Sequence, residues 1–233
     1  MRKGFTLAEV LITIGIIGVV SALTIPSLLA EYKEKQIVTR VKKEYSMLSQ
    51  AVRMMIAYNG QINEWGDQSY ETFERELLKQ LNVVKSCSEG HLCGAHYMNM
   101  PAHVLSNGLI VQLRNRRDCS VDYSTAADAL SGKKFDIFYC ASVNVYLSSR
   151  YNSRGHAIPN YKNKVFNFVV YSDGVLPQGH KNAGYDGNFK FCAPDSVSSA
   201  NCTAWVLYNE NIDYNYCKDK LSWDGAHSCK EAK

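Results

Sequence analysis

The sequence predicts an α+β fold in which one long N-terminal helix packs against an antiparallel β-sheet. Three observations support this: a charge-free apolar run over residues 10–30, an amphipathic helical pattern after it, and short β-rich runs in the second half. The chain has 233 residues, of which 46% are apolar and 21% charged. One domain of ordinary size with an appendage is therefore expected, and a large multidomain machine is excluded.

The apolar run is long enough to cross a membrane. Its 21 residues cover about 32 Å as a helix, which matches a hydrocarbon core of about 30 Å. Arg2 and Lys3 precede it and favour a cytoplasmic N-terminus, with the rest of the chain delivered outside the inner membrane. Glu9 and Pro26 do not suit a plain anchor. An intramembrane carboxylate costs on the order of 2.5–3.5 kcal/mol, and a proline is expected to kink the helix.

The residues Gly4-Phe5-Thr6-Leu7-Ala8-Glu9, with the isoleucine-rich run and Pro26 behind them, resemble the N-terminus of type IV pilins and type II secretion pseudopilins. The resemblance implies that prepilin peptidase cleaves between Gly4 and Phe5 and methylates the new N-terminus at Phe5. It also implies that Glu9 pairs with the N-terminal ammonium of a neighbouring subunit in a filament. Each of these charges is unfavourable alone in a helical bundle, so the pair would fix the stagger of an added subunit.

Two ordinary interpretations of the N-terminus stay open at this point. A secretory signal could end after Val20-Ser21-Ala22, so that the mature chain starts at Leu23, or the run could be a simple single-span anchor. A signal peptide has an apolar region of about 7–15 residues and no reason to hold a carboxylate at its edge. The pilin-like interpretation explains Gly4, Glu9 and Pro26 together.

The predicted organisation has four parts. They are a leader peptide at 1–4, a transmembrane and filament-core helix at 5–30, an amphipathic continuation at 31–58 and a globular head at 59–233. Apolar residues recur every three or four positions in the continuation, while charged residues, Glu44 among them, lie between; the apolar stripe is Ile37, Val41, Tyr45, Leu48, Val52 and Met55. We expect this stripe to dock on the head, Met47, Met54 and Met55 to serve packing, and Asn59-Gly60 to end the helix.

Further elements follow in the head. The spacing of Phe73, Leu77 and Leu81 predicts a short helix over about 70–81 with Ser69 as its cap. Beyond it, β-rich runs bounded by turn residues such as Asn107-Gly108 and Asp173-Gly174 predict strands at 109–113, 135–139 and 165–171. A long helix followed by an antiparallel sheet is also the layout that the pilin resemblance implies.

All eight cysteines lie in the last two-thirds of the chain, which indicates an oxidising compartment and disulfides. They are Cys87, Cys93, Cys119, Cys140, Cys192, Cys202, Cys217 and Cys229. Eight cysteines allow 105 connectivities, and we suggest only the sequence-near pairs 87–93, 192–202 and 217–229, with 119–140 left over. A zinc site built from Cys87, His91, Cys93 and His96 is disfavoured by its spacing and by the compartment.

No cofactor is expected, and the sequence contains no metal-binding motif. Major pseudopilins carry a calcium loop near the C-terminus, so structural calcium stays open. The available carboxylates, Asp186, Asp195, Asp213 and Asp219, show no convincing ligand spacing.

The predicted function is that of a structural subunit and not of an enzyme. The sequence contains no nucleophile elbow, no phosphate-binding glycine loop and no metal-binding histidine pair. The resemblance implies other pilin subunits, prepilin peptidase and an inner-membrane assembly platform as partners, first in the inner membrane with a periplasmic head. The filament would then be a periplasmic type II secretion pseudopilus or a cell-surface type IV pilus.

Two alternative functions remain. One is a minor pilin for adhesion or DNA uptake, with Arg114, Arg116 and Arg117 as the DNA contact, although a net charge of +4 does not by itself indicate nucleic-acid binding. The other is a membrane-tethered periplasmic enzyme.

Overall fold

The computed structural model describes residues 6–65, 70–114, 121–122, 138–151, 156, 158, 163–172, 174–179, 192 and 201–232. The chain divides into two compact units, residues 1–37 and residues 38–233. We refer to the second unit as the head.

Helix α1 (Leu7–Asn59) is continuous through Pro26. Leu7, Leu11 and the other large apolar side chains up to Leu29 are exposed, and among the described residues this is the one helix long and apolar enough to cross a membrane. α1 ends at Asn59, where Gly60 takes a left-handed φ of 79°, as predicted from the Asn-Gly pair. The kink expected at Pro26 stays a prediction.

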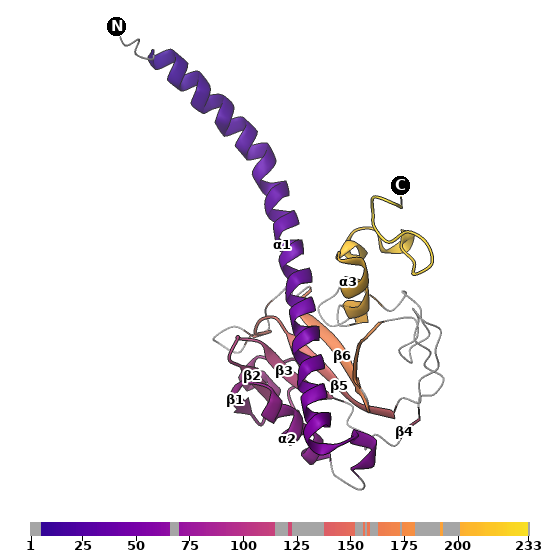
Figure 1. Cartoon of the computed structure of the whole chain (residues 1–233). Coiled ribbons are helices and arrows are strands. Elements are labelled where there is room, and N and C mark those ends of the chain that lie inside the picture. Colours follow the sequence, from indigo (N-terminus) through magenta and orange to yellow (C-terminus); the bar gives the residue numbers. More distant parts are fainter. Residues whose placement is uncertain are drawn as a thin grey trace. The chain divides into compact units, whose positions relative to one another are not determined.

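The head is built on one antiparallel sheet, which in the described residues contains seven strands (Figure 1). The strands are β1 (Val83–Cys87), β2 (Ala102–Leu105), β3 (Ile110–Arg114), β4 (Val121–Asp122), β5 (Phe138–Tyr146), β6 (Val165–Tyr171) and β7 (Gly174–Pro177). Their order is β1-β2-β3-β5-β6-β7, with β4 paired to β5. The neighbours are mostly consecutive in the chain, so the sheet is a meander with β4 beside its path.

The part of α1 that belongs to the head, residues 38–59, lies across one face of this sheet (Figure 1). We call this part the head half of α1. The face is apolar because alternate residues of the strands point to it; they include Val111, Leu113, Val143, Val145, Phe166 and Phe168. The rings of Tyr45 and Phe168 stack at 6.1 Å between centroids, and the Tyr45 hydroxyl donates to the Val175 carbonyl at 3.3 Å. The buried residues of the helix are Val38, Val41, Glu44, Leu48, Ala51, Val52 and Met55.

The opposite face of the sheet carries a buried polar row. Gln112, Asn144 and Asn167 stand side by side on β3, β5 and β6, since Gln112 pairs with Asn144 and Asn144 with Asn167. The Asn167 amide donates to the Asn144 side-chain carbonyl, and the Tyr146 hydroxyl donates to Gln112 at 2.9 Å. Directional bonds of this kind fix the register of the strands.

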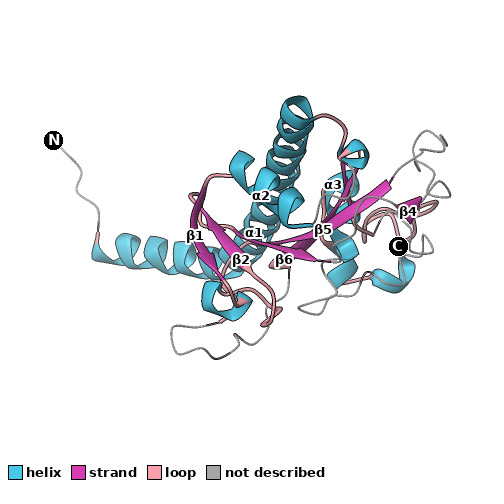
Figure 2. Cartoon of the chain, turned by 90° about the horizontal axis from the view of Figure 1, so that it is seen from below, coloured by secondary structure: helices cyan, strands magenta, loops and turns pink. Residues whose placement is uncertain are grey.

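The other helices pack around the sheet (Figure 2). The longer two are α2 (Tyr70–Gln80) and α3 (Thr203–Asn209), and the 3-10 helices are η1 (Ile62–Glu64), η2 (Gly90–Cys93), η5 (Asp213–Asn215) and η6 (Lys218–Lys220). α3 is held at its start, where the Thr203 hydroxyl accepts from the backbone of Asn167 at 2.8 Å. Trp205 of α3 is fully buried.

The α+β prediction is confirmed, with corrections in detail. The predicted strand at 165–171 matches β6, but the strand predicted at 135–139 is β5 and runs to Tyr146. Met54 does not pack as expected, because it lies on the exposed side of α1. Glu44 is buried and not on the polar side of the helix. Ser69, the expected helix cap, and Asp173 of an expected turn lie outside the described residues.

Helix docking gives a first prediction. Leu48, on the buried side of α1, is completely buried, so Leu48→Ala should lower the free energy of unfolding by about 2–5 kcal/mol through lost contacts and a cavity. Met54→Ala, on the exposed side of the same helix, should change it by less than about 0.5 kcal/mol. Denaturant unfolding of the two variants measures both values. Equal effects would contradict the helix face described here.

Candidate functional site

The first turn of α1 forms a reciprocal cap between Thr6 and Glu9. The Glu9 carboxylate oxygen Oε2 accepts from the Thr6 backbone N–H at 2.8 Å and from the Thr6 hydroxyl at 2.9 Å, while the Glu9 N–H donates to that hydroxyl at 3.3 Å. This is a capping box, which satisfies backbone donors that a helix start leaves open. Glu9 therefore has a local role in this chain that the sequence interpretation missed, although the T-x-x-E spacing signals it.

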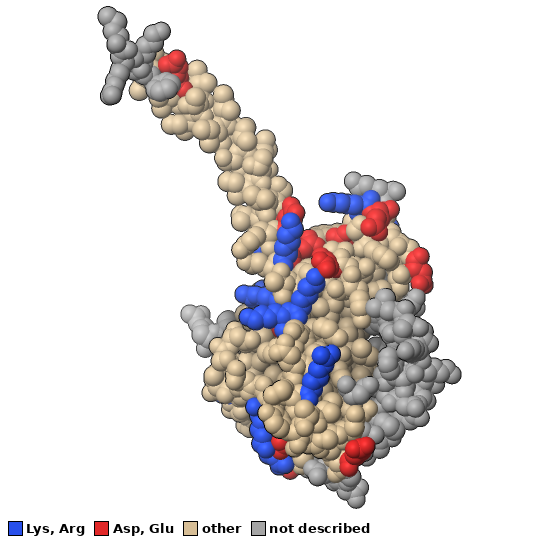
Figure 3. Space-filling view, viewed as in Figure 1, with Lys and Arg blue, Asp and Glu red and all other residues tan. Residues whose placement is uncertain are grey.

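The cap also orients the carboxylate. Both bonds from Thr6 end on Oε2, so Oε1 of Glu9 is the oxygen that a further donor can reach. The side chain is exposed at the start of a helix whose surface shows no charged side chain again until Glu31 (Figure 3). Gly4 and Phe5, the expected cleavage and methylation residues, lie outside the described residues.

Charge on the head half of α1 is of one sign on the solvent side. Arg40, Lys42 and Lys43 are exposed, and Figure 3 shows Lys and Arg side chains gathered along this part of the helix. Lys42 donates to Glu210 at 2.6 Å and so links α1 to the residue that ends α3. Both partners are largely exposed, so this ion pair contributes little to stability.

Glu44 has an unusual position for a carboxylate. It is 1% exposed on the buried face of α1, and neither of its oxygens has a hydrogen-bond partner in the described part of the chain. Burial raises its pKa from 4.5 to about 8, while the Coulombic attraction of Arg40 works in the opposite direction. The signal in the sequence was its register, since Glu44 stands three residues after Val41 and four before Leu48, both buried.

The expected DNA contact is only partly visible. The Arg114 guanidinium stacks on the Tyr97 ring, with Cζ 3.8 Å from the centroid, so this arginine has an internal partner. His96 lies edge-on against the same ring, and its pKa is lowered by burial and then by the positive charges of Arg150 and Arg114. Arg116 and Arg117 lie outside the described residues.

A serine, a histidine and a glutamate form a hydrogen-bonded row between β1, β2 and α2. His103 Nδ1 lies 2.9 Å from the Ser86 hydroxyl, and Nε2 lies 3.1 Å from Glu74 Oε1. Ser86 and His103 are opposite each other in the β1–β2 ladder, and Glu74 comes from α2. The row ties α2 to the sheet at a nearly buried histidine.

Three disulfides join cysteines of the described part of the head. Cys87 is bonded to Cys93, Cys192 to Cys202, and Cys217 to Cys229; Cys119, expected to pair with Cys140, lies outside the described residues.

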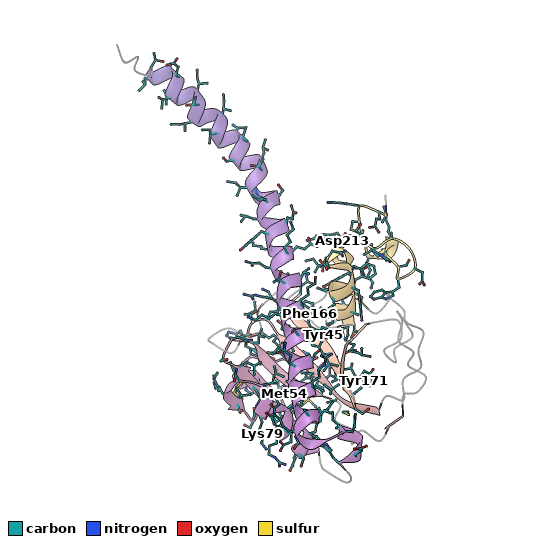
Figure 4. The ribbon with its side chains drawn as sticks, viewed as in Figure 1. Tyr45, Met54, Lys79, Phe166, Tyr171 and Asp213 are labelled. Atoms are coloured by element: carbon teal, nitrogen blue, oxygen red, sulfur yellow. A yellow bond between two sulfur atoms is a disulfide. The ribbon has the colours of Figure 1, made fainter. Side chains whose placement is uncertain are left out.

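Asp213 accepts from the Cys229 backbone at 2.6 Å and so fixes the C-terminal loop (Figure 4). Asp186 and Asp195 lie outside the described residues. The described residues contain no group of three metal-ligating side chains.

Comparison with known proteins adds two family matches. The model of the prokaryotic N-terminal methylation motif matches residues 1–25, and a model described as a family of unknown function (DUF6613) matches residues 27–219. The first match makes the N-terminus a prepilin motif of the type IV pilin and pseudopilin kind, and proteins with this motif are typically structural. No curated protein and no solved structure matches the chain.

The polar row gives a second prediction. His103→Ala should lower the free energy of unfolding by about 1–3 kcal/mol, because the Glu74 carboxylate then loses a partner in a partly buried site. His91→Ala is the matched control, since His91 is more exposed and lies 3.4 Å from Glu89, and its effect should be small. Denaturant unfolding compares the two. An equally small loss for His103→Ala would show that the row does not hold α2.

Proposed function

We propose that this chain, which belongs to the DUF6613 family of unknown function, is a pilin-like subunit that prepilin peptidase processes and that assembles into a helical filament. The observation that carries the proposal is the methylation motif at residues 1–25, which continues into one helix with an exposed apolar surface. Such a surface is stable in a membrane or against other apolar helices, and filament assembly replaces the first environment by the second.

In this proposal the chain enters the inner membrane through residues 5–30, with the leader 1–4 in the cytoplasm and the head outside. Cleavage between Gly4 and Phe5 then frees an N-terminal ammonium that is methylated. Residues 31–58 and 59–233 leave with the apolar part of the helix when the assembly platform adds the subunit to the filament. A secretion pseudopilus and a type IV pilus use the same steps.

The capping box supports a specific role for Glu9 in assembly. Both Thr6 donors bind Oε2, so an ammonium from a neighbouring subunit can bind Oε1 without breaking the cap. The neighbour's charge would replace solvation that Glu9 loses inside the filament. The carboxylate thus keeps the helix start ordered in the free subunit and receives its ionic partner on addition.

The alternatives receive less support. For DNA capture, the described member of the arginine group, Arg114, is already stacked on Tyr97. For an enzyme, the nearest arrangement to catalytic groups is the row Ser86, His103 and Glu74, which resembles a nucleophile, base and orienting carboxylate. A serine-reactive phosphonate that labels the wild-type chain but not Ser86→Ala would favour the enzyme over the structural subunit.

Processing gives a third prediction. The mature protein should begin with N-methylated Phe5 in cells that contain prepilin peptidase and retain Met1–Gly4 in cells that lack it. Mass spectrometry of the purified N-terminus measures this directly. A mature chain that starts at Leu23, or an uncut chain in both strains, would replace the proposal by a secretory signal or a plain anchor.

The two roles of Glu9 give a fourth prediction. Glu9→Gln keeps a capping residue but removes the charge, whereas Thr6→Val removes both hydrogen bonds of the Thr6 hydroxyl from the cap but keeps the charge. If charge pairing drives assembly, Glu9→Gln should reduce filament incorporation at least tenfold and Thr6→Val should affect it much less, with membrane insertion unchanged in both. Sedimented filaments and membrane fractions, quantified by immunoblot, give the two readouts. If Thr6→Val instead reduced filament incorporation more than Glu9→Gln does, Glu9 would act in helix capping alone.

A further inference from the structure

Glu44 lies at the contact between α1 and the sheet, where an ionised carboxylate is least stable. Its side chain is 1% exposed, and its neighbours on the buried helix face are apolar, including Val41 and Leu48. Neither carboxylate oxygen has a hydrogen-bond partner in the described residues. Burying a charge without a partner is strongly unfavourable, so burial favours the protonated form of this carboxyl.

The charged and titratable groups near this contact do not compensate the Glu44 carboxylate for its loss of solvent. Arg40, one turn earlier on α1, attracts the carboxylate but is itself exposed. From the sheet, the described side chains on the α1 face of β3, β5 and β6 are apolar, and Tyr45 directs its hydroxyl to the Val175 carbonyl. From the C-terminal segment, Glu210 is bound by Lys42. The pair Glu74 and His103 belongs to the α2 contact with β2.

We propose that Glu44 is a proton-controlled latch: its carboxyl is neutral while the head half of α1 is packed on the sheet, and loss of the proton loosens that packing. The latch goes beyond the proposed assembly role and does not depend on it, because helix and sheet contact lie within the head. Figure 4 labels Tyr45, the residue that follows Glu44 on α1, and Phe166 of β6.

The direction of the effect follows from the two states. Docked, the carboxyl has a pKa of about 8, whereas the undocked carboxyl in water has the ordinary value of 4.5. Between these two pKa values the docked state therefore binds more protons than the undocked state. The proton's contribution to docking is fully present below about pH 4.5 and decreases as the pH rises towards 8. Well above pH 8 the carboxyl is ionised in both states, and the contribution of its proton to docking is completely lost.

Trypsin cleavage measures how often α1 undocks from the sheet, because Arg40, Lys42 and Lys43 are cleavage sites on the docked helix. The full-length protein in detergent micelles is digested at pH 7 and pH 9, and each cleavage rate is divided by that of an unstructured peptide with the same sites. Between these pH values the normalised rate at the α1 sites should rise about tenfold in the wild type, since the undocked population grows with the proton difference. In Glu44→Gln, which has no proton to lose, the rate should stay constant.

Two further variants make the result unambiguous. Glu44→Leu places an apolar side chain at the same apolar position and should also remove the pH dependence. The test can therefore be made with Glu44→Leu if Glu44→Gln does not fold. Glu64→Gln removes an exposed carboxylate just beyond α1 and should behave as the wild type. An equal rise in wild type and Glu44→Gln, or an equal acceleration of cleavage at Lys85 in β1, would overturn the latch.

Discussion

The packing of α1 on the sheet is the contact on which the rest of the head depends. One continuous helix has to satisfy two environments: residues 10–30 are apolar on every side, whereas residues 38–55 bury one stripe and expose charge on the other. The sheet supplies the matching apolar face through alternate residues of β3, β5 and β6. Without the helix this face would be a large exposed apolar surface.

The two faces of the sheet are held by different forces. Apolar contact with α1 is strong but non-directional, so it specifies burial more than position. The row Gln112, Asn144 and Asn167 is directional and fixes the strand register from the other face. Among the described residues, three disulfides also close loops of the head.

The long helix and the fold class could be predicted from the sequence because both rest on periodicity that extends over many residues. The extension of β5 from Tyr139 to Tyr146 could not, since Ser142 and Asn144 are buried polar residues that interrupt a β pattern. Their partners lie on β6, about 25 residues away, and no local rule reveals them. Strand β6 is apolar at almost every position and was predictable for that reason.

The two carboxylates of α1 show why residue type alone misplaces function. Glu9 was assigned to an intersubunit pair, but its local spacing to Thr6 also makes it a cap. By residue type Glu44 belongs with the charged residues between the apolar positions, but its register with Val41 and Leu48 places it on the buried side of the helix. In both cases the position relative to neighbours on the helix determines the chemistry. The same helix thus carries one carboxylate that is exposed and capped at its start, and one that is buried without a hydrogen-bond partner among the described residues.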